Sequence, residues 1–200
     1  MKRAFDVAVA VIGLLVTSPI VLAAAIAVKL GSPGPVFYSG TRVGRDGKVF
    51  DIHKVRSMRV GAAAAGPAIT AEGDSRVTSA GRFLRRTKID EIPQLWNVLK
   101  GDMSLVGPRP EHPDYVSHFT TEQRRLLSVR PGMTGPAALA FHDEEDQLRG
   151  DDPVGTYLND LLPQKLAIEL QYLGRATFWS DLRIIFKTVA LMQRRLYARR

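Results

Sequence analysis

The sequence predicts an α+β fold that is mainly helical, with a membrane helix over residues 1–30 and a domain over residues 31–200. Three observations lead to this prediction. No charged residue occurs in the 22 positions between Asp6 and Lys29. Asp46-Gly47, a turn signal, separates two short segments of strand-like composition. Further along the chain, apolar residues recur at helical spacing.

The apolar run "VAVAVIGLLVTSPIVLAAAIAV" sets the first element. A straight helix of that length would be roughly 33 Å long, which is enough to cross a hydrocarbon core. Pro19 donates no N–H, and its ring clashes with the carbonyl of Leu15, so Ser18-Pro19 predicts a break in the helix. The Ser18 hydroxyl is a candidate partner for the freed backbone groups.

Three interpretations of this run stay open on the residues alone. It is a spanning helix, a helix that bends at Ser18-Pro19 and returns to the same face, or a cleaved signal peptide with Lys2-Arg3 at its start. Basic residues precede and follow the run, so the positive-inside rule gives no orientation. A re-entrant helix keeps both flanks on one side and removes that conflict.

The middle of the chain alternates strands, loops and short helices. "VFYSGTRVGRDGKVFDIHKVRSM" predicts a β-hairpin, and Gly61 to Gly73 predicts a loop. Arg82 to Arg86 predicts a short basic helix. Ile92, Leu95, Trp96 and Leu99 follow helical spacing, which predicts an amphipathic helix over residues 90–100. Residues 120–128 and 156–172 are also predicted to be helical.

The last segment, residues 178–200, is amphipathic, with apolar residues on one face and arginines on the other. Such a helix lies in a membrane interface or packs on a core with a solvated outer face. Both interpretations remain at this point.

Composition excludes several kinds of site. The chain has no cysteine, so disulfides, thiolate metal sites and cysteine nucleophiles are excluded. The formal net charge is +8, and residues 1–60 hold nine Lys or Arg against three Asp or Glu. A surface of this kind attracts nucleic acid, anionic lipid or nucleotide phosphates, and charge alone does not choose among them.

Asp90 and Glu91 stand side by side within a basic neighbourhood. They are predicted to be first-turn acids of the helix that follows, where a helix dipole favours negative charge, and Pro93 agrees with a helix start. Arg85 precedes the pair, and "GPRP" presents Arg109 between two prolines. Guanidinium groups bind phosphate oxygens in pairs, and carboxylates beside such a clamp hold Mg²⁺ or attack phosphorus.

Other motifs add less. The chain has neither a GxxxxGK[ST] loop nor GxGxxG, and its four histidines lack metal-ligand spacing. "HDEEDQLRGDD" does not match a calcium loop and is predicted to be a solvated acidic face. "VRPGMTG" is either a nucleotide-binding turn carrying Arg130 or a plain tight turn.

The stretch "DEIPQLWNVLKGDMSLVGPRP" resembles the signature of the bacterial sugar transferases, the small monotopic phosphoglycosyl transferases. Further segments resemble the family in the same order along almost the whole chain: "KRAFD", "SPGPVFY", "RVGRDGKVF", "KVRSM", "GRFLRRTKIDE", "RPGMTG" and "LLPQKLAIELQYL". Twenty near-matching consecutive positions make the resemblance specific.

The resemblance implies a mechanism. A UDP-sugar donates its sugar-1-phosphate to polyprenyl (undecaprenyl) phosphate, which releases UMP through a covalent phosphosugar-enzyme. By similarity Asp90 is the nucleophile and Glu91 binds Mg²⁺ with it. The implied phosphate-binding residues are Arg109, Arg85, Lys54 and Arg130. The product would begin the assembly of a membrane-linked glycan such as an exopolysaccharide.

The resemblance also implies a topology and partners. Ser18 and Pro19 match the break of a re-entrant helix, so the catalytic domain is expected on the cytoplasmic face of the bacterial inner membrane, with residues 178–200 as an interfacial helix. Expected partners are the UDP-sugar, polyprenyl phosphate and membrane lipid, with a homodimer as a further candidate and no nucleic acid. The chain is expected to be the minimal form of the family, without preceding spanning helices.

Departures from the family pattern limit which residue roles are carried over from the family to this chain. Glu169 stands where the family usually has Asp, three residues before Tyr172, and its role stays open. Val55 replaces the usual Phe, and "PAALAFHDEE" replaces a common Asn-Gly-Arg, so no sugar is assigned. The alternative function is a catalytically inactive, membrane-anchored interaction protein, and intact Asp90, Glu91 and Arg109 argue against it.

Overall fold

The computed structural model describes residues 1–148, 150 and 152–197. It is mostly helical, with two small sheets. Its helices and strands are α1 (Lys2–Gly31), β1 (Phe37–Val43), β2 (Val49–Val55), α2 (Ser79–Thr87), α3 (Gln94–Lys100), β3 (Ser104–Val106), α4 (Pro113–Val116), β4 (Gly132–Thr134), α5 (Pro136–Ala140), α6 (Glu144–Gln147), α7 (Pro153–Thr156), α8 (Leu162–Leu173) and α9 (Phe178–Tyr197).

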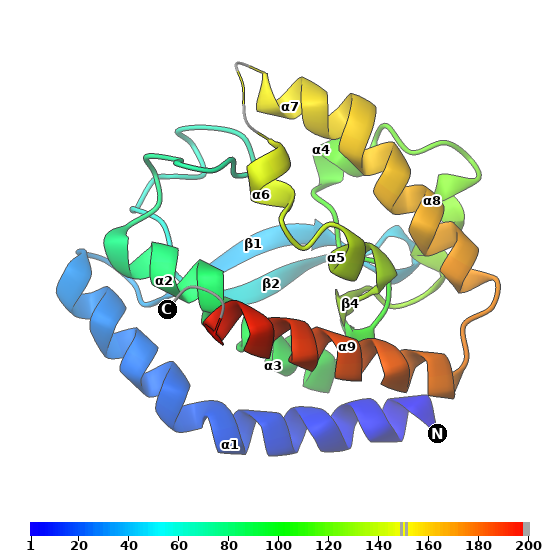
Figure 1. Cartoon of the computed structure of the whole chain (residues 1–200), viewed down its shortest axis with the longest axis horizontal. Helices are drawn as coiled ribbons and strands as arrows, with labels where there is room; N and C mark the ends of the chain where they lie inside the picture. The colour runs from blue at the N-terminus through cyan, green and yellow to red at the C-terminus, as the bar shows by residue number, and fades with distance from the viewer. Residues whose placement is uncertain (149, 151, 198–200) are drawn as a thin grey trace.

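The hairpin of β1 and β2 lies near the centre of the molecule (Figure 1). The two strands pair antiparallel from Phe37 opposite Val55 to Val43 opposite Val49. Asp46 has φ 59° and Gly47 has φ 73° in the turn between them, which confirms the predicted Asp46-Gly47 hairpin. β3 and β4 form a second, parallel pair, with Ser104 opposite Gly132.

Buried apolar side chains form clusters on two sides of the hairpin. One cluster joins α1, β2, α3, β3 and α9 through residues that include Ala10, Ile52, Val98 and Ile184. Another joins the end of β1 to α4 and α8. The α1–α3 contact is close, because a Cβ on Gly13 would lie 2.9 Å from a methyl carbon of Leu95.

Helix α1 is continuous through Pro19. Pro19 cannot donate to the carbonyl of Leu15, and the Ser18 hydroxyl donates to that carbonyl at 2.8 Å instead. Thr17 adds a hydroxyl bond to the carbonyl of Gly13 at 2.6 Å. Figure 1 shows the helix bent near its middle. The predicted break is therefore a bend in one helix, and the predicted rescue by Ser18 is confirmed.

The first turns of α1 are bonded to the domain. Arg3 donates to the carbonyls of Val98 and Leu99 at 2.6 and 3.0 Å, and so caps the C-terminal end of α3. Asp6 is 3 % exposed and accepts a hydrogen bond from the Ser104 hydroxyl at 2.8 Å. Lys2 pairs with the buried Asp181 of α9.

The far end of α1 is bonded to the same domain. Arg56, just after β2, donates to the carbonyls of Pro33 and Ser32 at 2.8 and 3.1 Å. Between its two anchored ends, α1 exposes a row of large apolar side chains, including Ile12, Leu15, Val16, Leu22 and Ile26. By length and composition, α1 is the one helix among the described residues that could cross a membrane.

Several predicted elements need correction. The helix predicted over residues 90–100 begins at Gln94, after a 3-10 turn over Ile89–Glu91. Residues 120–128 hold only a 3-10 turn, Gln123–Ser128. The helix predicted over residues 156–172 is a π turn, Tyr157–Leu161, followed by α8. The predicted basic helix is confirmed as α2, and Gly61 to Gly73 is a loop as predicted.

Helix α9 confirms the predicted C-terminal helix as far as Tyr197, and residues 198–200 lie outside the described part of the chain. One face packs on the domain through Asp181 and Ile184. The other leaves Trp179 and Phe186 exposed. The helix thus combines a packed face with an exposed aromatic one.

Gly81 allows α2 to approach the segment that follows β2, the strand that carries Lys54. A Cβ at this position would lie 1.8 Å from the backbone oxygen of Ser57. We expect Gly81→Ala to lower the free energy of unfolding by about 3 kcal/mol or more, the upper end for overpacking, because the obstacle is backbone. Thermal unfolding in detergent measures this. Gly31→Ala is the control, since its Cβ would meet only Ala80, at 3.9 Å; equal stability of both variants would contradict the prediction.

Candidate active site

The chain reverses just before the acidic pair. Lys88 has φ 57°, and its N–H caps α2 by bonding to carbonyls of the last turn. This left-handed residue turns Asp90 and Glu91 inward, in a 3-10 turn ahead of α3. The prediction that they are first-turn acids of that helix is wrong: Pro93 is the N-cap residue, and α3 starts at Gln94.

Glu91 is held by two cations from distant elements. Its Oε1 accepts hydrogen bonds from Nζ of Lys54 at 3.0 Å and from Nη2 of Arg109 at 3.3 Å. Burial opposes its ionisation, but the charges of Lys54, Lys88 and Arg109 prevail and hold the pKa of Glu91 well below its usual range. Glu91 is therefore a carboxylate at neutral pH.

The neighbouring carboxyl group has a different environment. Asp90 is 4 % exposed, and its Oδ1 is buried without a hydrogen-bond partner in the described part of the chain. Burial raises the pKa of Asp90, and the charge of Glu91 adds to the rise. Such an orphaned acceptor is costly to bury, and native proteins keep it mainly where function requires it.

Arg109 is presented by the turn that follows β3. The backbone of this turn is fixed against β4: Gly107 donates to Thr134 at 3.0 Å, and Gly132 donates to Pro108 at 2.9 Å. Gly107 is required there, because a Cβ would lie 2.5 Å from the backbone oxygen of Arg130. Glu91 raises the pKa of Arg109, so its guanidinium stays charged.

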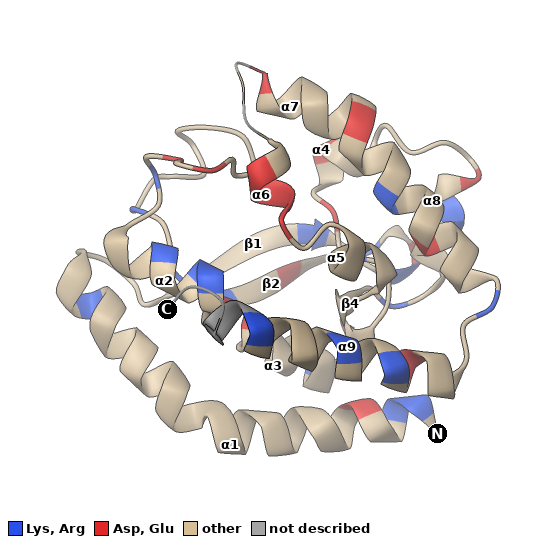
Figure 2. Cartoon of the chain, viewed as in Figure 1, with Lys and Arg blue, Asp and Glu red and all other residues tan. Residues whose placement is uncertain are grey.

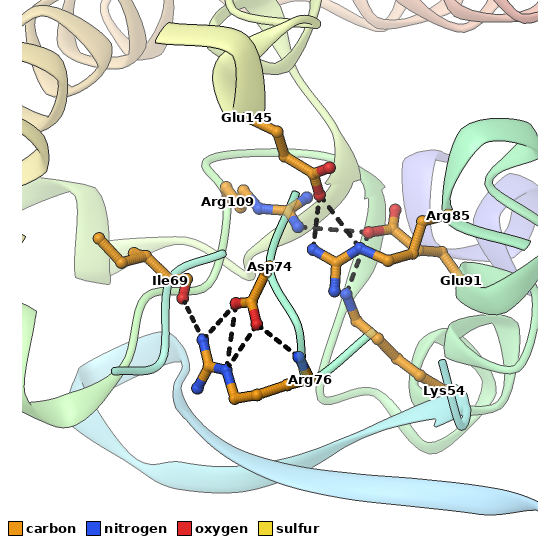
Figure 3. Close-up of polar contacts among 8 residues, drawn as sticks. All are labelled: Lys54, Ile69, Asp74, Arg76, Arg85, Glu91, Arg109 and Glu145. Atoms are coloured by element: carbon orange, nitrogen blue, oxygen red, sulfur yellow. Dashed lines mark hydrogen bonds and ion pairs between the residues drawn. The ribbon is translucent and has the colours of Figure 1, made fainter. Parts of the chain in front are cut away.

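Arg85 lies beside this cluster and is paired with a different acid. Its Nε and Nη2 donate to Oε1 of Glu145, on α6, at 3.1 and 2.5 Å. Figure 3 shows Arg85 between Glu145 and the group of Lys54, Glu91 and Arg109. The acidic segment predicted to be a solvated face thus contributes Glu145 to the site; Figure 2 shows its acidic residues on α6 in red.

The structure places two predicted site residues elsewhere. Arg130 lies toward the far end of α3 from Asp90, and its Nε donates to the carbonyl of Gly101 at 2.8 Å. Glu169 lines a largely aliphatic pocket beside Arg109, and its Oε1 accepts from the backbone N–H of Ala137 at 3.2 Å. The roles of both residues stay predictions. Among the described residues, neither Arg130 nor Glu169 is hydrogen-bonded to Glu91.

Sequence reasoning missed three residues around the site. Burial lowers the pKa of Arg42, and the nearby charge of Arg109 lowers it further. Lys165 is 4 % exposed and bonded to Glu144 at 2.7 Å. Asn97 is fully buried and joins α3 to β2 by accepting from the N–H of His53 at 3.0 Å and donating to the carbonyl of Asp51 at 2.7 Å. All three lie in segments that resemble the family: Asn97 in the signature stretch, Arg42 in "RVGRDGKVF" and Lys165 in "LLPQKLAIELQYL".

The adjacent carboxylates fit a magnesium ion. Mg²⁺ is usually held by one or two carboxylates together with water and substrate phosphates. Asp90 offers an unpartnered oxygen, and Glu91 is ionised beside it. No group of three or more His, Asp or Glu residues arranged for a metal occurs in the described residues, so substrate oxygens would have to complete the coordination.

Comparison with known proteins identifies the family to which the chain is similar. The bacterial sugar transferase family matches residues 1–195. A UDP-glucose:undecaprenyl-phosphate glucose-1-phosphate transferase of Caulobacter vibrioides is 42% identical over 191 residues, which cover 94% of this chain and 68% of the relative. An Escherichia coli protein of the same description is 39% identical over 198 residues, 94% of this chain but 39% of the relative. An exopolysaccharide production protein of Rhizobium leguminosarum is 39% identical over 94% of this chain and 93% of its own length.

Glu169 predicts a pH dependence of stability. Burial raises its pKa from 4.5 to about 7. The folded chain keeps this proton up to a pH near 7, whereas the unfolded chain releases it near 4.5, so stability should fall as pH rises between these values. Glu169→Gln should remove that part of the fall and stabilise the chain by up to about 3 kcal/mol at pH 8. Melting temperatures in detergent from pH 4.5 to 8 measure this; parallel curves for variant and wild type would contradict it.

Proposed function

Because the chain belongs to the bacterial sugar transferase family, we propose that it transfers a sugar-1-phosphate from a UDP-sugar to undecaprenyl phosphate and releases UMP. The printed descriptions of its relatives support this donor and acceptor class. The observation that carries the proposal is the contrast within the acidic pair. Glu91 is neutralised by Lys54 and Arg109, whereas Asp90 has a buried oxygen without a partner among the described residues.

This contrast supports different roles for the two acids in the proposed reaction. Asp90 is the nucleophile: its free oxygen forms a bond to the phosphorus that carries the sugar, and the bond from this phosphorus to UMP breaks. An oxygen of undecaprenyl phosphate then attacks the phosphosugar on Asp90, which restores the carboxylate and gives the polyprenyl-diphospho-sugar. Dividing one displacement into two in this way is ordinary covalent catalysis.

The cations serve the charge that develops on phosphorus. Lys54 and Arg109 are fixed before substrate binds, because Glu91 orients both, so little reorganisation is needed during the reaction. Asp90 and Glu91 would hold Mg²⁺, which neutralises charge on the donor phosphates when bound. The raised pKa of Asp90 requires such positive charge nearby, so that the nucleophile is ionised when substrate is present.

The anchoring of α1 supports a re-entrant topology. Arg3 and Asp6 tie one end of the helix to the domain, and Arg56 ties the other end to the same domain. A straight spanning helix would separate those ends by the thickness of the membrane. We place the domain on the cytoplasmic face of the inner membrane, with the exposed apolar face of α1 in lipid. The exposed Trp179 and Phe186 of α9 suit the interface.

The nucleophile assignment predicts the effect of one substitution. Asp90→Asn should lower turnover of UDP-sugar by at least about a hundredfold, because an amide oxygen does not form the bond to phosphorus. Folding should be kept, since a buried acid with a raised pKa is replaced by a neutral group of the same shape. UMP release measures turnover. Intact-mass analysis of enzyme mixed with UDP-sugar should show a sugar-phosphate adduct on the wild type and none on the variant.

Asp46→Asn is the matched control, because Asp46 lies exposed in the hairpin turn and is paired only with Arg45 in the described structure. It should retain both turnover and adduct. An Asp90→Asn enzyme with more than about a tenth of wild-type turnover would remove Asp90 as nucleophile.

The topology has its own test. The chain has no cysteine, so one cysteine added before Met1 and, separately, Arg45→Cys can be labelled selectively. With an impermeant thiol reagent, both should react only after the cells are permeabilised. Ser18→Ala combined with Pro19→Ala removes the bend and should move part of the population to a spanning form whose N-terminus is labelled from outside. Outside labelling of the unmutated N-terminus would refute the re-entrant helix.

A further inference from the structure

The acidic helix α6 contains a carboxylate that the proposed reaction does not use. Glu145 accepts two hydrogen bonds from the Arg85 guanidinium, and the two residues are 60 positions apart in the chain. The Glu145 side chain is 46% exposed and that of Arg85 is 22% exposed. This ion pair is therefore accessible from solvent, whereas Oδ1 of Asp90 is buried.

The guanidinium in this pair faces the reaction centre. Figure 3 shows it next to Lys54 and Glu91, on the side of the cluster from which Glu145 enters. Any anion bound to Arg85 therefore lies beside Lys54 and Glu91.

The position of α6 does not depend on the side chain of Glu145. Glu144 bonds to the buried Lys165 of α8 at 2.7 Å. The backbone carbonyl of Glu145 accepts from the N–H of Glu72 at 3.0 Å. The side chain of Glu145 can therefore rotate away from Arg85 while the backbone of α6 stays in place.

We propose that Glu145 binds Arg85 at the position that a phosphate group of the nucleotide-sugar donor takes. The donor displaces the Glu145 side chain from Arg85 when it binds. The N–H groups of a guanidinium donate to either a carboxylate or a phosphate in the same geometry. A half-exposed ion pair is weak, so its loss costs little, whereas a diphosphate brings more negative charge and more acceptor oxygens. Glu145 thereby keeps Arg85 oriented in the free enzyme and competes with the donor. This inference rests on the function proposed above.

A double-mutant cycle with UDP as the probe tests the exchange. The full chain in lipid nanodiscs is titrated with UDP at low salt by calorimetry. Glu145→Gln should tighten UDP binding by about twofold to fivefold, the range for an exposed ion pair, and the gain should shrink in high salt. In an Arg85→Gln background, adding Glu145→Gln should give no gain. Glu122→Gln, an equal charge change at an exposed residue of another segment, should leave binding unchanged.

Three results would overturn the proposal. Weaker UDP binding by Glu145→Gln would make Glu145 a ligand or a support for the donor, and unchanged binding would mean no competition. A gain that persists in the Arg85→Gln background would be a general field effect. UMP release by the wild type is measured in parallel. Its presence with any of these three results removes only the exchange, whereas its absence with every UDP-sugar tested removes the proposed function itself.

Discussion

The architecture of the site depends on the neutralisation of Glu91. A carboxylate with only 15% of its side chain exposed requires positive partners, and those partners come from two other parts of the chain. Lys54 comes from the hairpin strand β2, and Arg109 comes from the turn after β3. The hairpin, the β3–β4 pair and the turn before α3 must therefore meet at one place. The same contacts leave Asp90 adjacent and buried, with an oxygen that has no partner among the described residues.

Much of this arrangement was predictable because it lies in continuous sequence. The stretch from Asp90 to Pro110 contains both acids, Arg109 and Asn97. The position of the acids relative to α3 was not predictable, since it depends on the left-handed conformation of Lys88, a residue type that gives no signal for it. The pairing of Arg85 with Glu145 was also hidden, because residues 60 positions apart share no local pattern.

The basic residues at the N-terminus bind other parts of the chain in the structure. On sequence, Lys2 and Arg3 were charged flanks that gave no clear orientation to an apolar helix. In the fold they are binding groups: Arg3 caps α3, and Lys2 pairs with Asp181 of α9. Asp6, at the boundary of the apolar run, accepts a hydrogen bond from Ser104, the first residue of β3. The "KRAFD" segment therefore fixes α1 to the elements that carry the candidate site.

The capping of α3 by Arg3 has a consequence for biosynthesis. The ribosome makes Arg3 95 residues before Val98, the carbonyl that it binds. At about 5–20 residues per second, roughly 5–20 s pass between the two, and during that time α1 exists without its partner. A helix with the length and composition to cross a membrane is thus available for insertion before α3 exists for Arg3 to cap.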